Sequence, residues 1–404
     1  MTPPAPTSGA REKLLTRPFL LLVFSHFAQA LAYASMLLLP LYVEHLGANR
    51  SQIGTIMAAA AVGGLLFRPA AGWALDHVGR RPTLLVGTVV LFVGMSLIAF
   101  VDRLGPLVYV ARFIIGMGVG TLFTGYFTWA ADLVPESRRT EGLALFGVSG
   151  LLPLAIGPVV QQFGVATPDL RWLFPIVGAA ILVSSLTLFF IHEPERHRAP
   201  ADDDVSAAQA LTQPGLRPVW LATVVFAGLV SVFFAFATVT AANRGIADSA
   251  AVWFTYAAGA IGVRLLGARL PDRIGPTNLV APALACYGGA YLLAAGAWSV
   301  QAFMVAGLLA GLGHGYCFPV LTSQVVTRAP DRLRGGALAT FTFTWELSGL
   351  VLTPLFGWIA DVTDDATMLT TATLFGMVGL SAWAVWEHRV AGLRPQRATG
   401  GGGG

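Results

Sequence analysis

Twelve long apolar runs occupy most of the chain and constrain its fold more than any other feature. A bilayer core of about 30 Å needs roughly 20 mainly apolar residues per helix. The runs are continuous, whereas the strands of a membrane barrel alternate apolar and polar residues. The sequence therefore predicts an all-α membrane protein with twelve transmembrane helices, at 19–43, 52–75, 83–101, 106–130, 142–163, 171–192, 217–240, 250–270, 279–298, 301–325, 336–360 and 367–388.

The composition agrees with a lipid environment. The 404-residue chain is 55% hydrophobic and only 11% charged, whereas ordinary soluble domains are about one quarter charged. The formal net charge is +4, but the basic residues form short clusters between the apolar runs, so we expect them to orient the chain in a membrane rather than to bind nucleic acid. Cys286 and Cys317 lie inside apolar runs without a Cys or His at ligand spacing, so we expect neither a disulfide nor a metal site.

The segments outside the runs divide the chain. Residues 1–18 are predicted to form a cytoplasmic tail, 19–192 and 217–390 two six-helix halves, and 193–216 a cytoplasmic linker. The first run is too long for the core of a cleavable signal peptide and is interpreted as the first span. Residues 391–404 form a second tail, whose terminal glycines are interpreted as an artificial addition.

The basic residues predict the orientation of the chain. If the N-terminus is cytoplasmic, the cytoplasmic segments hold eighteen of the twenty-five lysines and arginines. The outer loops then hold only Arg50, Arg103, Arg171 and Arg244. Cytoplasmic loops of membrane proteins carry such an excess, so we expect both termini to be cytoplasmic, in a bacterial-type inner membrane.

An internal repeat relates the two halves. A first set of residues recurs 195 positions later: Gly116, Gly118, Gly120, Pro135 and Arg139 correspond to Gly311, Gly313, Gly315, Pro330 and Arg334. A second set recurs 195 or 196 positions later: Gly72, Asp76 and Gly79 correspond to Gly267, Asp272 and Gly275. Two matches at nearly one offset indicate duplicated, pseudo-symmetric halves, a transporter plan with a substrate site near the bilayer midplane.

A family resemblance lies at the second match. The stretch Gly72-x-x-x-Asp76-x-x-Gly79-Arg80-Arg81 resembles the best-known motif of the major facilitator superfamily, and 267–275 resembles its second copy. The resemblance extends over about 19–390. It implies a secondary transporter that works by alternating access, with two halves that rock about a central site.

Three further stretches resemble motifs of the superfamily and of its twelve-span drug:proton antiporter branch. These are Arg112-x-x-x-Gly116-x-Gly118 in the fourth span, Leu39-Pro40-Leu41 in the first, and Gly147, Gly150, Gly157 and Pro158 in the fifth. The last of them resembles the antiporter motif, which continues with paired glycines. Here Gln161 and Gln162 stand after the proline instead.

The resemblance and the repeat predict a gating motif at the cytoplasmic ends of the helices. Its glycines permit close approach of helix ends, and Asp76 could pair with basic residues or cap a helix. Such contacts would break and re-form as the halves rock; in the alternative reading, Arg80 and Arg81 only set the topology. The predicted members are Gly72, Asp76, Gly79, Arg80, Arg81, Asp132, Gly267, Asp272 and Gly275.

Glu346, Arg112 and His26 are the candidates for proton coupling. Glu346 is the only acidic residue deep inside a predicted span. Because apolar surroundings disfavour a charged carboxylate, Glu346 could exchange protons near neutral pH or pair with a cationic substrate; a structural glutamate is the alternative. Helix packing is the alternative for Arg112 and for His26. Arg68 and Arg264 occupy similar places in the two halves, which favours a shared structural role over substrate contact.

An aromatic, weakly polar cavity is also predicted. Gln29 and Tyr33 follow His26 on one face of the first helix, and aromatic rings with few fixed charges suit amphipathic solutes. Ordinary packing is the alternative for most of these rings. The predicted cavity residues are Gln29, Tyr33, Tyr126, Tyr256, His314, Tyr316, Thr342 and Trp345.

The leading functional hypothesis is proton-coupled efflux of amphipathic small molecules. The alternative is a proton-coupled uptake symporter of a small organic solute, for which Arg112 would supply a positive charge. The chain contains no GxxxxGK[ST] loop, no metal-ligand cluster and no Ser/His/Asp arrangement, so we expect neither an enzyme nor a cofactor. The expected partners are a small-molecule substrate, protons and the lipid bilayer, and this architecture can work as a monomer.

Overall fold

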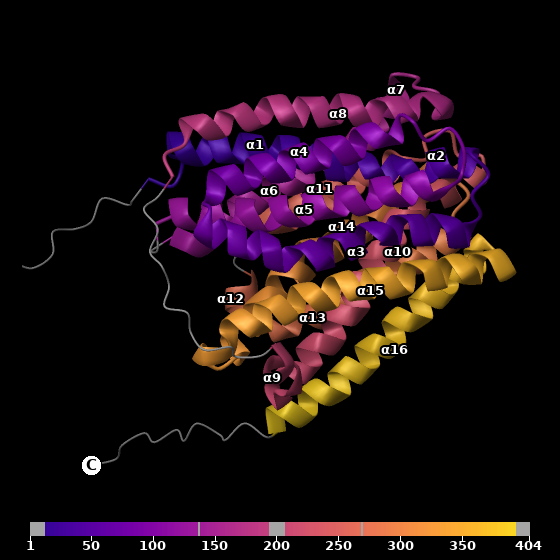
Figure 1. Ribbon diagram of the computed structural model, residues 1–404. Coiled ribbons are helices and arrows are strands. Elements are labelled where there is room, and N and C mark those ends of the chain that lie inside the picture. Colours follow the sequence, from indigo (N-terminus) through magenta and orange to yellow (C-terminus); the bar gives the residue numbers. More distant parts are fainter. Residues whose placement is uncertain (1–12, 136–137, 194–206, 268–269, 393–404) are drawn as a thin grey trace, which may run out of the picture.

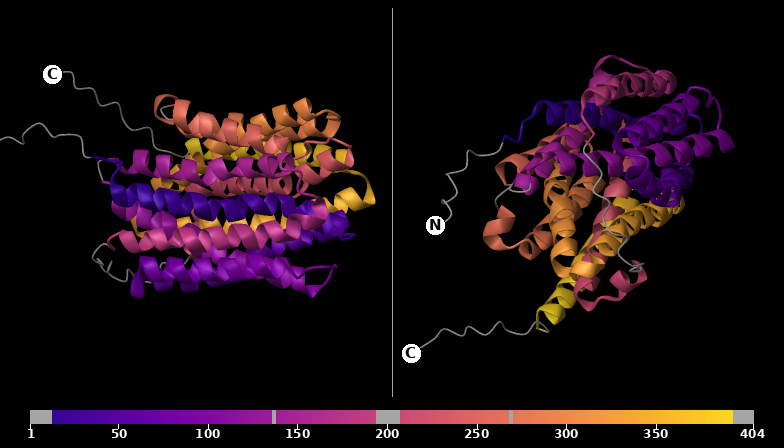
Figure 2. Two further views of the ribbon diagram at one scale, coloured as in Figure 1. Left: turned by 90° about the horizontal axis from the view of Figure 1, so that it is seen from above. Right: turned by 60° about the vertical axis from the view of Figure 1, so that its left-hand side comes forward.

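The computed structural model describes residues 13–135, 138–193, 207–267 and 270–392. Every regular element in this part of the chain is a helix. The long helices form one bundle and extend between the same two ends of it, with α16 inclined to the helices of the first half in Figure 1 (Figures 1 and 2). The first helix, α1 (Arg17–Ser35), begins at the same end of the bundle at which the last, α16 (Asp365–Gly392), ends. We call this the terminal end and the opposite one the distal end.

Six helical segments form the first half. Three of them change from α- to 3₁₀-geometry along their length, at η1, η3 and η5. They are α1 with η1 (Met36–Leu38) and α2 (Leu39–His45), α3 (Arg50–His77), α4 (Arg80–Ile98), α5 (Pro106–Leu133), α6 (Arg139–Leu151) with η3 (Leu152–Ala155) and α7 (Ile156–Gln162), and α8 (Leu170–Ser184) with η5 (Ser185–Phe190).

The second half repeats this arrangement. Its six long helices are α10 (Arg217–Asn243), α11 (Ala251–Leu266), α13 (Thr277–Gly296), α14 (Val300–Arg328), α15 (Arg334–Val362) and α16. Short helices precede or connect them: α9 (Ala207–Thr212), η6 (Pro214–Leu216), α12 (Leu270–Ile274) and η7 (Asp331–Leu333). Helices are required here because lipid offers no hydrogen-bond partner to an unpaired backbone group.

The structure confirms the predicted all-α fold with twelve long segments. Within the described ranges, ten helical segments are long and apolar enough to cross a membrane. The other two predicted spans are α11, with 16 residues, and α15, with 29. Threonines and Glu346 reduce the hydropathy of α15, yet both helices pack within the same bundle as the other ten.

Parts of the predicted linker and tails lie outside the described residues, namely 1–12, 194–206 and 393–404. The described end of the linker packs on the second half. Trp220 Nε1 donates a hydrogen bond to the Ala210 carbonyl at 3.3 Å, and Arg328 Nη1 donates one to the Gly215 carbonyl at 3.4 Å. The domain boundaries themselves stay predictions.

Glycine contacts show the internal repeat in three dimensions. A Cβ atom built on Gly116 of α5 would lie 1.9 Å from the Ala60 carbonyl oxygen of α3. A Cβ atom built on Gly311 of α14 would lie 2.1 Å from the Tyr256 carbonyl oxygen of α11. Small residues allow such close helix approach in membranes. The same pair of helices therefore packs backbone to backbone in each half.

We expect Gly116→Ala to destabilise the protein strongly, because the new methyl group would overlap rigid backbone rather than a movable side chain. Overpacking of this kind costs about 1–3 kcal/mol. Gly72→Ala is the matched control, since a Cβ atom at Gly72 would have no atom within 4 Å. Thermal unfolding in detergent measures both variants. Equal melting temperatures would contradict the close α3–α5 contact.

Candidate substrate and coupling site

The two halves contact each other mainly along two pairs of helices, and α10 makes further contacts with α2, η1 and α3. The first pair is α3 with α15, and the second is α11 with α6, η3 and α7. The pairs correspond to each other in the repeat, because α3 and α11 occupy the same place in their respective halves. Hydrogen bonds between the halves are concentrated at the distal end.

Arg50, at the start of α3, is the centre of the distal contacts. Its Nε and Nη2 atoms donate hydrogen bonds to the two carboxylate oxygens of Asp365, at 2.8 and 2.9 Å. Its Nη1 atom donates to Glu44 Oε1 at 2.5 Å, and the same oxygen accepts a hydrogen bond from Asn243 Nδ2 at 2.8 Å. Glu44 and Arg50 belong to the first half, and Asn243 and Asp365 to the second.

Asp361 of α15 caps the first turn of α3 from across the interface. Its two carboxylate oxygens accept hydrogen bonds from the backbone N–H groups of Arg50 and Ser51, both at 2.8 Å. A carboxylate is stabilised at a helix N-terminus because the backbone N–H groups there are unpaired and the helix dipole is positive. The cap therefore stabilises contact between the halves at this end.

Gln161 joins the halves at the second helix pair. Its Nε2 donates to Ser249 Oγ at 2.9 Å, and its Oε1 accepts from the Ala250 backbone N–H at 2.8 Å. Gln161 is one of the two glutamines that depart from the antiporter motif. The glutamine at this position thus adds polar contacts between the two halves at the distal end.

One ion pair joins the halves about midway along the helices. Arg68 Nη2 of α3 lies 3.0 Å from Glu346 Oε1 of α15, and the two side chains are 20% and 28% exposed. The sequence predicts a coupling role for Glu346 and favours a structural role for Arg68. The structure makes them partners.

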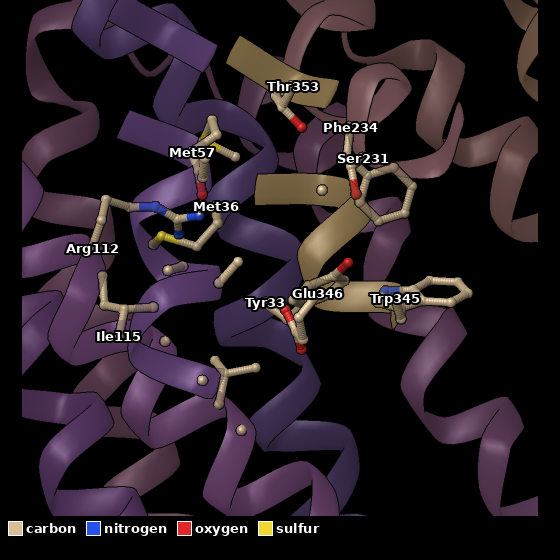
Figure 3. Close-up of a pocket in the computed structure, with 18 of the residues that line it drawn as sticks. Tyr33, Met36, Met57, Arg112, Ile115, Ser231, Phe234, Trp345, Glu346 and Thr353 are labelled. Atoms are coloured by element: carbon tan, nitrogen blue, oxygen red, sulfur yellow. Dashed lines mark hydrogen bonds between the residues drawn. The ribbon is translucent and has the colours of Figure 1, made fainter. Parts of the chain in front are cut away.

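A cavity of about 170 Å³ lies beside this ion pair (Figure 3). Six helical elements line it: α1, η1, α3 and α5 from the first half, and α10 and α15 from the second. Pockets for drug-sized ligands have about 300–1,000 Å³, so a larger solute requires the halves to separate. The wall includes Tyr33, Met36, Met57, Arg112, Ile115, Ser231, Phe234, Trp345, Glu346 and Thr353.

Arg112 extends into the cavity from α5, on the opposite side from Glu346 and Trp345 in Figure 3. Its Nε and Nη2 donate to the backbone carbonyls of Ile56 and Met57 of α3, at 3.3 and 2.9 Å. The side chain is buried. Arg112 therefore provides a fixed positive charge in the cavity and, within the described residues, has no ion-pair partner there.

Four predicted residues thus line the cavity: Tyr33, Arg112, Trp345 and Glu346. Tyr33 is 41% exposed and its ring lies 5.9 Å from that of Phe234 on α10. In Figure 3 the side chains of Tyr33 and Glu346 lie next to each other. The aromatic wall therefore comes from both halves.

Other predicted residues make contacts inside one half and do not line this cavity. His26 Nδ1 is 2.7 Å from Ser149 Oγ, with its ring stacked on Phe146. Tyr126 Oη is 2.5 Å from Ser25 Oγ. These contacts pack α1 against α5 and α6.

In the second half, Tyr256 holds His314. Tyr256 Oη lies 2.5 Å from His314 Nδ1 and 2.6 Å from Tyr287 Oη. The three side chains form a polar chain across α11, α13 and α14. His314 also lies near Phe234 and Trp345, with ring centroids 6.4 Å apart in both cases, so this chain backs the cavity wall.

The remaining cavity candidates lie elsewhere. Gln29 is buried in α1. Thr342 Oγ1 donates to the Ala339 carbonyl of its own helix at 3.0 Å. Tyr316 lies near the end of α11, where its hydroxyl would be 2.0 Å from a Cβ atom on Gly267. Gly267 thus leaves room for Tyr316.

The first copy of the gating motif forms contacts within its own half. Arg80 Nε lies 3.1 Å from Asp132 Oδ2 and Arg80 Nη1 lies 3.4 Å from Asp76 Oδ1. The Arg80 backbone N–H also bonds to Glu193, and Arg81 Nη2 donates to the Ile191 carbonyl at 2.6 Å. These contacts tie α3, α4 and α5 to the end of the first half. They do not join the two halves, so the role of the motif as a latch stays a prediction.

The glycines of the motif differ in their backbone requirement. Gly79 and Gly275 have φ values of +124° and +86°, which favour glycine. Gly72 lies within α3 in open space. Asp272 belongs to α12, and its side chain is outside the described part of the chain.

Comparison with known proteins decides the family. Residues 19–353 match the sequence pattern of the Major Facilitator Superfamily. The chain belongs to this superfamily. It is therefore a multi-pass membrane transporter of small-molecule substrates, and not an enzyme.

Several relatives of this superfamily member have informative names. It is 26% identical over 196 residues to the multidrug resistance protein MdtL of Klebsiella pneumoniae, a match that covers 46% of this chain and 49% of that protein. It is 27% identical over 359 residues to the gentisate transporter of Corynebacterium glutamicum, covering 82% of this chain and 79% of that protein. The solved structure of the nucleoside transporter NupG has a TM-score of 0.76 and 12% identity, covering 92% and 99% of the two chains. That likeness shows the fold alone.

Proposed function

We propose that this transporter couples proton movement to the export of amphipathic small molecules. The observation that carries the proposal is the Arg68–Glu346 ion pair, because it joins the two halves and its carboxylate also lines the cavity. Protonation of Glu346 would remove the charge that attracts Arg68. Proton binding, solute binding and the contact between the halves are then linked at one residue.

Resemblance to exporters supports the direction. The glycines of the antiporter-like motif, Gly147, Gly150 and Gly157, lie on α6 and α7, where this half meets α11. MdtL, which resembles about half of the chain, is named for multidrug resistance. The excess of basic residues near the chain termini supports a cytoplasmic terminal end, with the distal end facing outward from an inner membrane. The cavity would then load from the cytoplasm.

Uptake coupled to protons is the second candidate. It is favoured by Arg112, which brings a fixed positive charge into the cavity. The gentisate transporter, which is similar over most of the chain, is named for the transport of an organic acid. In such a symporter, protons and solute would move in the same direction.

The test uses purified protein in liposomes that contain a pH-sensitive dye and carry an imposed proton gradient. A panel of cationic, neutral and anionic amphiphiles is added in turn. Proton release triggered by a substrate, and abolished by a protonophore, is the expected result. Proton movement in the same direction as the solute would establish symport instead, and solute movement without protons would contradict proton coupling.

A further inference from the structure

Arg264, near the end of α11, corresponds to Arg68 but has a different environment. Arg68 is paired with Glu346 across the halves. Arg264 crosses to the first half at the equivalent helix pair, where it meets Gly147: a Cβ atom on Gly147 would lie 2.4 Å from Arg264 Nη1. Glycine thus stands where a carboxylate could have paired with the guanidinium.

No described residue accepts a hydrogen bond from the guanidinium of Arg264. Its Nε atom is buried and unpaired, as is that of Arg68, but Arg68 has Glu346 as a partner for its Nη2 atom. The position in the last turn of α11 gives the positive charge a favourable interaction with the helix dipole, but it leaves the N–H groups without acceptors. A buried donor without a partner is costly, and more so when it is charged.

The charged side chains between the halves also have a positive balance, in agreement with an unpaired Arg264. Of the twenty-five lysines and arginines, the sequence assigns eighteen to the predicted cytoplasmic segments and four to the predicted outer loops, which leaves three: Arg68, Arg112 and Arg264. Glu346 is the one acidic residue at this depth in the described helices, and it is paired with Arg68. Arg112 has only backbone carbonyls as partners. At this depth the described residues between the halves therefore carry three positive charges and one negative charge.

We propose that the transported solute carries a carboxylate, or an anionic group of similar charge, and that Arg264 binds it. A guanidinium presents several N–H donors in one plane, which suits a carboxylate with two acceptor oxygens. Trp345 in the cavity wall, with the ring of His314 behind it at a centroid distance of 6.4 Å, provides contact for the apolar body of such a solute. This inference names the substrate class of the proposed transporter and rests on that proposal.

Binding to protein in phosphatidylcholine nanodiscs, without a proton gradient, tests the inference. The probes are naphthoate, naphthamide and naphthylmethylammonium, which share one ring system and differ in charge. We expect the wild type to bind naphthoate at least about tenfold tighter than naphthamide, since a charge-assisted hydrogen bond contributes about 1.5–3 kcal/mol. Arg264→Gln should remove that preference, because naphthoate loses a charge-assisted hydrogen bond whereas the neutral carbonyl of naphthamide loses a weaker one.

Gly147→Asp supplies a second test that leaves the arginine in place. The new carboxylate would lie against Arg264 and compete with naphthoate, whereas the equally sized Gly147→Asn should compete much less. Equal binding of the probes by the wild type, no binding of any of them, or a naphthoate preference that persists in Arg264→Gln and Gly147→Asp would overturn the proposal. Loss of the preference when anionic phosphatidylglycerol is added would assign the site to a lipid headgroup instead. Because no proton gradient is used, each of these results leaves proton-coupled export to be judged separately.

Discussion

Replacing Glu346 with glutamine is expected to reduce substrate-triggered proton release to the level of protein-free liposomes. Glutamine keeps the size of the side chain and its hydrogen-bonding ability, but it cannot take up or release a proton. Glu346 is the only carboxylate that lines the cavity in the described part of the chain. The dye-filled liposomes described above measure the release. Binding of a neutral substrate should remain, since the cavity wall is otherwise unchanged.

The control for this variant is Asp102→Asn, which neutralises an exposed carboxylate in a distal loop. It should release protons as the wild type does. If Glu346→Gln also releases protons normally, Glu346 is a structural partner of Arg68, and the proton path lies elsewhere.

A double-mutant cycle separates the coupling role of Glu346 from its structural role. Arg68→Gln leaves the carboxylate of Glu346 without its partner. Because both side chains are partly exposed, we expect a loss of about 1–3 kcal/mol, less than for a fully buried pair. The variant that combines Arg68→Gln with Glu346→Gln should unfold at a higher temperature than Arg68→Gln alone. Additive losses would contradict a direct interaction.

The long helices and the key acid could be predicted because lipid imposes strict rules. A span needs about 20 apolar residues, and a charged side chain at that depth must face the bundle interior. Glu346 lies inside a predicted span and carries a charge, so the second rule applies to it, and it does line the cavity. The same rule applies to Arg68 and Arg264, yet similar places in the repeat suggested one shared role. The partners are what differ: Glu346 for Arg68, and Gly147 for Arg264.

The aromatic and weakly polar residues of the cavity were harder to predict. Tyr256 and Tyr126 can satisfy their hydroxyl groups inside one half, with His314 and Ser25 respectively, so no rule forces them toward the centre. The rotation of each helix is set by backbone contacts such as Gly311 with Tyr256. These depend on the packed partner helix, which the residue pattern of a single helix does not reveal.

Arg50→Gln is expected to shift the protein toward a state in which the distal end is open. The arginine side chain is only 11% exposed and holds Asp365 with two hydrogen bonds. Its loss leaves the carboxylates of Glu44 and Asp365 close together without the positive charge between them. Because both carboxylates are partly exposed, we expect their loss of the partner to cost about 1–3 kcal/mol in total, which corresponds to a change of roughly 5- to 150-fold in the open-to-closed ratio.

Distances between spin labels on His45→Cys and Thr363→Cys measure this shift, because both positions are exposed at the distal end and belong to different halves. Cys286 and Cys317 are first replaced by alanine. Arg50→Gln should lengthen the mean distance, whereas Arg103→Gln, an exposed distal arginine outside this network, should leave it unchanged. Transport by Arg50→Gln should fall at the same time, because alternating access requires the distal end to close as well as to open. An unchanged distance would mean that the Asp361 cap and the Gln161 contacts are sufficient to hold the distal end closed.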